Sequence, residues 1–230
     1  KKIGREKLFE TFLNNVAKHE SGDDAYNAYN RGACSTCGSR GNAAMKKAWG
    51  KVLSELTIAQ VTKQVMVDKR IEGKAAFATG KYQIVPFTLR NAIKKIKGCD
   101  TNEVYGPEQQ EAFAAYLVLM KRPNLGKYLL GDTSITAERA QLNAAMEWAG
   151  IRVIAKHYRK KKKYRAAQQL VPGNSYYKNY DNTCTGTKDS NPDDIRLERA
   201  RATAAAIEKT RQACDKNPVA QEIAKQIIGK

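Results

Sequence analysis

The sequence predicts a mainly α-helical fold, because helical signals dominate along the chain. Apolar residues recur at helical spacing, and a proline or a capping residue precedes several of these stripes. The 42% hydrophobic and 28% charged content of the 230 residues is that of an ordinary globular protein, which excludes wholesale disorder. We therefore expect one domain over residues 1–230, with the helices of residues 194–230 packed on it.

The first predicted helix covers residues 5–19 and has one apolar face. Four side chains at helical spacing form this face: Phe9, Phe12, Leu13 and Val16. Gly22 is well placed to end the helix. A loop rich in Gly, Cys and Ser is expected over residues 32–42.

Three further helix starts follow in the middle of the chain. Residues 57–60, Thr-Ile-Ala-Gln, have the pattern of a capping box in front of an apolar stripe. Residues 73–85 are expected to form a loop or short hairpin, after which Pro86 stands in the first turn of the next helix. Pro107 opens another helix, which Pro123 is expected to close.

The C-terminal part of the chain is expected to hold three more helices. The first runs over residues 136–157, the second, rich in Ala and Arg, over residues 194–214, and Pro218 starts a short final one. Residues 172–192 are polar and rich in Asn, Tyr, Gly and Ser, which predicts a long loop. Loops of more than about 12–15 residues are commonly functional or disordered.

The chain is strongly basic. Lys and Arg number 41 against 23 Asp and Glu, which gives a formal net charge of +18. A charge of this size favours a polyanionic partner such as nucleic acid, anionic lipid or cell-wall polymer. The run of residues 158–165, Tyr-Arg-Lys-Lys-Lys-Lys-Tyr-Arg, reads either as a polyanion-binding patch or as a solvated face at a helix end. The longest apolar run, residues 112–120, is too short to span a membrane.

Cysteines and histidines give little support for a metal site. Five cysteines are too few for a disulfide scaffold of this length, and their odd number leaves one unpaired within the chain. Cys34 and Cys37 have the spacing of half a zinc site, but no second pair follows, so free thiols or one disulfide are the alternatives. The chain begins Lys-Lys-Ile without an initiator methionine, which indicates a fragment of a larger protein.

Glu20 is the best single candidate for a catalytic group. It follows Val16 by four residues and therefore continues the apolar face of the first helix. A carboxyl group at the rim of a core is partly desolvated, which raises its pKa toward the value that a general acid needs. The alternative is an ordinary solvent-facing residue at the end of a helix.

Short motifs around Glu20 and further along the chain carry a resemblance to a known family. The chain reads Lys-His-Glu-Ser-Gly over residues 18–22, Gly-Lys-Tyr-Gln-Ile-Val-Pro-Phe-Thr over residues 80–88, and Pro-Gly-Asn-Ser-Tyr-Tyr over residues 172–177. From about Leu8 to Ala200, this order resembles the lysozyme-like peptidoglycan-cleaving domains of large-phage endolysins and related muramidase toxins. More distantly, it is similar to the goose-type lysozyme and lytic transglycosylase superfamily. The fold implied is a helical domain with a small hairpin or loop region beside a cleft.

The resemblance implies a role for each matched residue. Glu20 would protonate the glycosidic oxygen between N-acetylmuramic acid and N-acetylglucosamine, and Ser21 would support the local turn or the carboxyl group. Thr88 would start the helix behind the cleft. The expected sugar contacts lie along the cleft and its far wall: Tyr29, Asn30, Tyr82, Gln83, Tyr176 and Tyr177.

The sequence departs from the family pattern at the second catalytic residue. Phage lysozymes that invert configuration place an aspartate nine residues after the acid, where this chain has Tyr29. Asp23 and Asp24 are expected to be solvent-facing turn residues, and Glu147 is a candidate second acid that can equally be a packing residue. Two-carboxylate hydrolysis and a single-acid lytic transglycosylase reaction through Glu20 both stay open.

The predicted function is therefore that of a peptidoglycan-degrading muramidase, a lysozyme or lytic transglycosylase. It would act as a monomer, with no metal and no cofactor, in the bacterial periplasm or cell wall, as part of a phage endolysin or a secreted antibacterial toxin. Its partners would be glycan strands and, through the basic surface, anionic wall polymers. The alternatives are a basic nucleic-acid-binding module, which the dispersed basic residues and missing recognition motif disfavour, and a catalytically inactive wall-binding domain.

Overall fold

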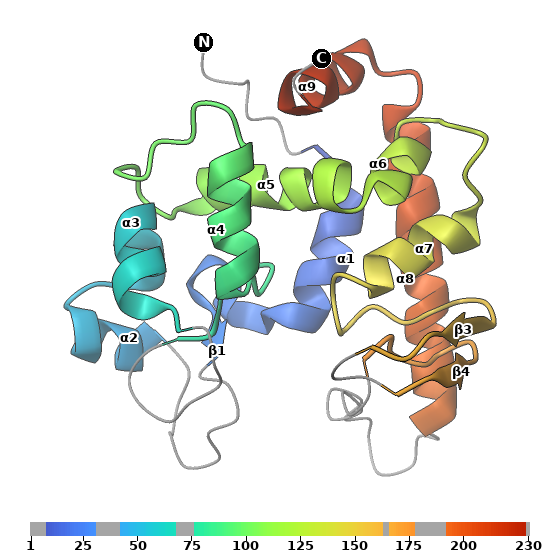
Figure 1. Cartoon of the computed structure of the whole chain (residues 1–230), viewed down its shortest axis with the longest axis horizontal. Helices are drawn as coiled ribbons and strands as arrows, with labels where there is room; N and C mark the ends of the chain where they lie inside the picture. Colours follow the sequence, from blue (N-terminus) through green and yellow to red (C-terminus); the bar gives the residue numbers. More distant parts are fainter. Residues whose placement is uncertain (1–7, 31–41, 68–75, 163–165, 178–191, 229–230) are drawn as a thin grey trace. The chain divides into compact units, whose positions relative to one another are not determined.

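A computed structural model describes residues 8–30, 42–67, 76–162, 166–177 and 192–228. The structure is mainly helical, which confirms the predicted fold class at that level (Figure 1). The described residues divide into two compact units, the first made of residues 20–116 and the second of residues 8–19 and 117–228.

The first unit contains short helices and one small sheet. Its elements follow the end of helix α1 in this order: η1 (Gly22–Asn27), β1 (Tyr29–Asn30), α2 (Asn42–Trp49), η2 (Leu53–Glu55), α3 (Ile58–Gln60), η3 (Val61–Val65), β2 (Ala78–Thr79), α4 (Pro86–Lys95) and α5 (Pro107–Tyr116). The capping box at the start of α3 is confirmed, because the Thr57 hydroxyl accepts from the Gln60 amide at 3.1 Å and the Gln60 side chain accepts from the Thr57 amide at 2.9 Å. Pro86 and Pro107 each begin a helix as predicted.

The sheet of the first unit joins two segments that are far apart in the sequence. β1 and β2 are antiparallel, with Tyr29 opposite Thr79 and Asn30 opposite Ala78. Directly after β2 the chain turns back on itself, and Thr79 and Ile84 exchange two backbone hydrogen bonds of 3.0 and 2.9 Å. The predicted short hairpin is therefore present among the described residues of that stretch.

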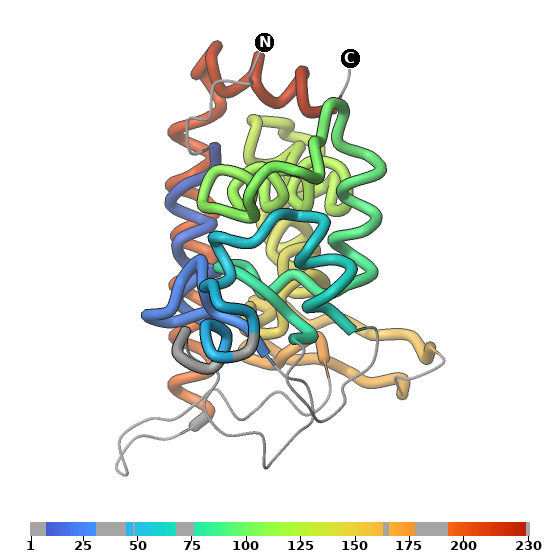
Figure 2. Tube along the Cα trace, turned by 90° about the vertical axis from the view of Figure 1, so that its left-hand side faces the viewer, coloured from blue at the N-terminus to red at the C-terminus, as the bar shows by residue number. Residues whose placement is uncertain are grey.

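The second unit is built around the long helix α8 (Pro192–Cys214). Its other elements are α1 (Glu10–Glu20, of which Glu20 belongs to the first unit), η4 (Leu117–Lys121), α6 (Pro123–Leu129), α7 (Ala137–Ala145), the strands β3 (His157–Arg159) and β4 (Gln168–Leu170), and α9 (Pro218–Ile228). In Figure 2, α1 runs alongside α8. Two hydrogen bonds join these helices: the Phe12 amide donates to the Thr210 hydroxyl and the Thr203 hydroxyl donates to Asn15, each at 2.9 Å.

Two predicted boundaries are wrong, and a third position has a second role. α1 begins at Glu10 rather than near residue 5, because Phe9 has a left-handed backbone (φ +66°) that no helix accommodates. The predicted helix over residues 136–157 ends at Ala145. Pro123 closes the preceding helix as expected, but it also occupies the first turn of α6.

The early end of α7 has a tertiary cause. The Gln141 side chain donates to the backbone carbonyl of Arg152 at 2.9 Å, and Arg152 forms an antiparallel bridge with Ser175. The chain is thereby drawn out of the helical path and reaches β3, where His157 pairs with Leu170. The basic run therefore starts in a β-hairpin and not at a helix end.

Several expectations fall outside the described residues. These are most of the loop over residues 32–42, the pair Cys34 and Cys37, and much of the loop over residues 172–192. Cys99 and Cys214 are free thiols. Within the ranges that the structure covers, His, Cys, Asp and Glu side chains form no group of three or more that could hold a metal ion. No helix within those ranges is both long and apolar enough to cross a membrane.

Candidate functional site

Glu20 is the last residue of α1 and is half-buried. The helix leads up to it with the buried side chains of Leu13, Val16 and Ala17, so the predicted apolar face is present. Gly22 has φ +56°, a left-handed conformation that favours glycine, and lies two residues beyond the helix end. The sequence Glu-Ser-Gly therefore places one carboxyl group at the point where a buried helix stops.

His19, next to Glu20 in the chain, is half-buried and held in its neutral form. Burial lowers the pKa of its imidazole from 6.5 to about 4, and the positive charges of Arg199, Lys18 and Arg152 act in the same direction. At neutral pH this side chain therefore adds no positive charge beside Glu20.

The segment after Glu20 is joined to the Gly80 turn by the small sheet. Besides the β1–β2 pairing, the Gly80 amide donates to the Ala28 carbonyl at 2.7 Å, and the Phe77 amide donates to the Asn30 carbonyl at 2.6 Å. Residues 28–30, which follow the Glu-Ser-Gly motif, and residues 77–80, which lead into the Gly80 turn, thus lie side by side in one unit. Tyr29 and Asn30 are brought to this junction, with Tyr29 buried and Asn30 half-buried.

The Gly80 turn has two residues with left-handed backbone. Gly80 has φ +78°, and Gln83 has φ +47°, a conformation that a non-glycine residue rarely adopts. The Gln83 side-chain amide donates to the Gly80 carbonyl at 3.0 Å, a bond that spans the turn. Gln83 is half-buried, whereas Thr88 is buried in α4.

The side chain of Gln110 on α5 binds both motif segments through their backbones. Its Nε2 donates to the carbonyls of Tyr26 at 2.9 Å and Tyr105 at 2.8 Å, and its Oε1 accepts from the Lys81 amide at 2.8 Å. The side chain is 1% exposed, and these three bonds use both amide hydrogens and the carbonyl oxygen. Gln110 is therefore a fully satisfied buried bridge between Tyr26 and Lys81.

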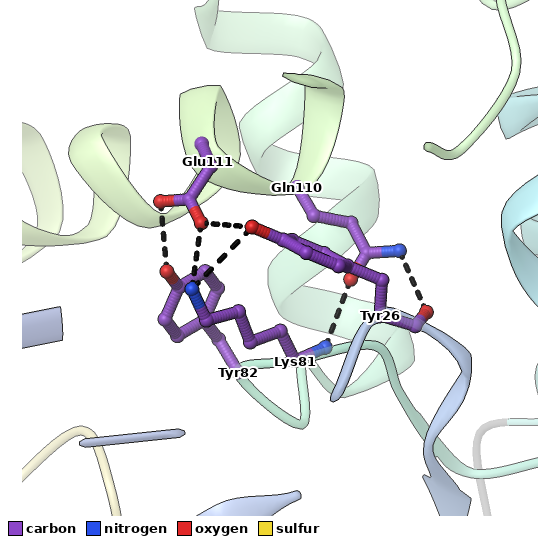
Figure 3. Close-up of polar contacts among 5 residues, drawn as sticks. All are labelled: Tyr26, Lys81, Tyr82, Gln110 and Glu111. Atoms are coloured by element: carbon purple, nitrogen blue, oxygen red, sulfur yellow. Dashed lines mark hydrogen bonds and ion pairs between the residues drawn. The ribbon is translucent and has the colours of Figure 1, made fainter. Parts of the chain in front are cut away.

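The next residue, Glu111, binds the same two segments through their side chains, as Figure 3 shows. Its Oε1 accepts from the Tyr26 hydroxyl at 2.7 Å and lies 3.0 Å from the Lys81 ammonium, and its Oε2 accepts from the Tyr82 hydroxyl at 2.7 Å. The Lys81 ammonium also lies over the rings of Tyr26 and Tyr82, 5.0 and 5.3 Å from their centroids. We call Gln110 and Glu111 with these partners the α5 clamp.

The geometry changes the role expected of Tyr82. Its ring is 1% exposed and its hydroxyl is bound to Glu111, so the ring offers no free face on which a sugar could stack. Tyr82 instead anchors the turn on which Gln83 stands. Tyr29, at 4% exposure, is likewise a packed ring.

Ser21 is half-buried between α1 and η1, and three further expected site residues, Glu147, Tyr176 and Tyr177, lie in the second unit. Glu147 is 7% exposed, and each of its carboxylate oxygens binds one cation, Lys121 at 2.7 Å and Arg122 at 2.8 Å. The Tyr177 hydroxyl and the Arg122 guanidinium both donate to the Met146 carbonyl at 2.5 Å. The Tyr176 ring is 6% exposed and meets the Tyr177 ring edge-on. Glu147 and Tyr177 are therefore brought together through the end of α7, as part of a paired polar network.

The sequence reasoning missed Gln110 and Glu111. The signal available was weak: two adjacent polar residues near the start of a predicted helix, three and two positions before its apolar Phe113. Only the tertiary structure shows that the Gln110 side chain is buried and hydrogen-bonded to Tyr26, Lys81 and Tyr105.

Comparisons with known proteins add no identification. The chain matches no protein-family model, no curated protein and no solved structure.

Proposed function

We propose that this chain is a peptidoglycan glycosidase of the muramidase class, which cleaves the β-1,4 bond between N-acetylmuramic acid and N-acetylglucosamine. One observation supports it most: the β1–β2 pairing joins Tyr29 and Asn30, which follow Glu20 by nine and ten residues, to the strand that leads into the Gly80 turn, within one unit. β1 follows one of the two strongest motifs of the lysozyme-like resemblance and β2 precedes the other, and the two strands are otherwise about fifty residues apart. Such an enzyme would act in the bacterial periplasm or cell wall.

Glu20 is the general acid in this proposal. Its carboxyl proton goes to the glycosidic oxygen as the bond from that oxygen to the anomeric carbon breaks. The structure places Glu20 half-buried at the end of α1.

Four other carboxylates considered for a second acid either have bound partners or are exposed. Glu111 binds two hydroxyls and Lys81, and Glu147 binds two cations. Asp23 and Asp24 are exposed in η1, as predicted for turn residues. This pattern favours the single-acid route, in which the deprotonated Glu20 takes the proton of a hydroxyl of the muramic acid sugar while that oxygen attacks the anomeric carbon.

Digestion of purified peptidoglycan with the wild-type chain tests the proposal. We expect soluble muropeptides whose terminal muramic acid is lighter by one water, because the internal hydroxyl replaces the attacking water. Mass spectrometry of the products measures this directly. Products with an ordinary reducing end would keep the muramidase and overturn the single-acid route, and the absence of any cleaved glycan would contradict the function itself.

The basic surface is the proposed contact with anionic wall polymers. Residues 148–180 contain nine Lys and Arg and no Asp or Glu. On β3, Tyr158 is 57% exposed, and Lys156 and Lys160 on either side are exposed as well. Side chains two residues apart on a strand share one face, so these three form a basic surface around an aromatic ring.

Replacing Lys160, Lys161 and Lys162 together by Gln should lower activity on whole cell walls about fivefold and leave activity on short soluble glycans nearly unchanged. The reason is that three fewer cations weaken adhesion to a polyanion without altering the residues proposed for catalysis. Turbidity loss of wall suspensions measures the first activity, and cleavage of short soluble glycans, followed by mass spectrometry, measures the second. A matched control removes three exposed lysines of the first unit, Lys94, Lys95 and Lys97. If the control loses as much as the hairpin variant, the hairpin has no special role.

A further inference from the structure

The α5 clamp binds the two motif segments twice, through two adjacent residues of one helix. Gln110 binds the backbones of residues 26 and 81, and Glu111 binds the side chains of the same two residues. Adjacent side chains of a helix point about 100° apart around its axis. Gln110 and Glu111 therefore contact the two segments from two different directions. Packing of the unit alone does not require this duplication.

The charges of the clamp are matched with little access to water. The side chains of Lys81 and Glu111 are 12% and 17% exposed and lie 3.0 Å apart, and the two tyrosine hydroxyls complete the coordination of the carboxylate. A charge-assisted hydrogen bond is stronger and more directional than a neutral one, so the carboxylate fixes Lys81 and Tyr82 with little freedom. These two residues directly precede Gln83, whose backbone is held at φ +47°.

We infer that Gln110 and Glu111 are positioning residues of the glycosidase: they hold the Gly80 turn, and with it Gln83, in register with the segment that follows Glu20. This inference rests on the proposed function and adds Gln110 and Glu111 to the residues on which that function depends. Glu111 acts through Lys81, Tyr26 and Tyr82, and it transfers no proton itself. A misplacement of about 1 Å between substrate and enzyme can cost roughly a hundredfold in rate. Loosening the clamp, which displaces Gln83 and the substrate it contacts, should therefore lower kcat more than it raises KM.

The test compares Glu111→Gln with Glu108→Gln. Glu108 is an exposed residue in the first turn of the same helix, so both variants lose one negative charge from α5. We expect kcat on soluble glycan fragments to fall about tenfold in Glu111→Gln, with KM changed less than twofold, and both constants to stay at wild-type values in Glu108→Gln. The backbone amides of residues 81–83 should exchange hydrogen faster in Glu111→Gln only.

A double-mutant cycle separates positioning from general loss of stability. Lys81→Met should also lower kcat about tenfold. The double variant Lys81→Met/Glu111→Gln should be at most about twofold slower than either single variant, because both substitutions remove the same ion pair. Ile207→Val, which shortens a buried side chain of α8 in the second unit, should lower the melting temperature while keeping kcat. Additive losses near a hundredfold, or a fall in kcat for Ile207→Val as large as for Glu111→Gln, would overturn the inference.

The failure of this inference can be told apart from failure of the proposed function. If Glu20→Gln is inactive and Glu111→Gln has normal kcat and normal amide exchange, the clamp does not position the site and the glycosidase proposal stands. If the wild type releases no glycan, the glycosidase proposal fails and takes the positioning role with it.

Discussion

The Glu20→Gln variant is expected to lose wall-lysing activity by a factor of at least about a thousand. General acid catalysis contributes roughly a hundredfold to ten-thousandfold, and an amide cannot supply the proton. In the single-acid route the loss should lie at the upper end of that range, because Glu20 acts first as acid and then as base. Turbidity loss of wall suspensions and mass spectrometry of released muropeptides measure the effect.

The matched control for this variant is Glu10→Gln, an exposed carboxylate in the first turn of the same helix. It removes the same charge from α1 and should leave lysis unchanged. Binding of Glu20→Gln to insoluble walls should equal that of the wild type, because the basic surface is intact. Undiminished lysis by Glu20→Gln would exclude Glu20 as the acid, and lost wall binding would point to a structural effect of the substitution.

Much of the local structure could be predicted because short-range chemistry determines it. The capping box of Thr57 and Gln60, the prolines at the starts of α4 and α5, and the glycine after α1 each involve backbone groups within a few residues of one another. The sequence also indicated a short hairpin before Pro86 without indicating its partner. That partner, β1, lies about fifty residues earlier, and pattern alone does not specify such pairings.

The helix predicted over residues 136–157 shows how periodicity can mislead. The apolar stripe predicted for this helix consisted of Leu142, Met146, Ala149 and Val153; Leu142 and Val153 are buried, whereas Met146 and Ala149 are half-buried, so the pattern located core residues only in part. However, the bond from Gln141 to the Arg152 carbonyl and the bridge from Arg152 to Ser175 accompany a series of turns and bends in the second half, which is not helical. Tertiary hydrogen bonds outweighed a local preference that differs by less than about 1 kcal/mol per residue.

The candidate site was only partly predictable for a related reason. Glu20 and the Gly80 turn stand out as motifs, whereas Gln110 and Glu111 are ordinary helix residues in the sequence. Their role depends on which segments approach α5, and that depends on the whole first unit. Tyr82 illustrates the converse: an aromatic residue in a motif was expected to meet sugar, but its hydroxyl is bound to Glu111 and its ring is buried.

Gly80→Ala is expected to be the most destabilising small substitution in the first unit, at about 3 kcal/mol. A Cβ at this position would lie 2.3 Å from Oε1 and 2.8 Å from Cδ of Gln110. Gln110 cannot move aside without breaking its buried bonds to Tyr26, Tyr105 and Lys81, each worth about 1–3 kcal/mol when a buried partner is left unsatisfied. The backbone at φ +78° adds about 1–2 kcal/mol for any residue with a Cβ.

Gly98→Ala isolates the two causes. Gly98 has nearly the same φ of +75°, but nothing lies within 4 Å of the position that its Cβ would take, so its variant should lose only the backbone term of about 1–2 kcal/mol. Urea unfolding measures both variants, and the difference between them is the cost of disturbing Gln110. If that difference is near zero, Gln110 yields easily and does not hold the turn. If it is about 2 kcal/mol and glycan cleavage falls further in Gly80→Ala than in Gly98→Ala, the close approach of α5 to the Gly80 turn is needed for both stability and activity.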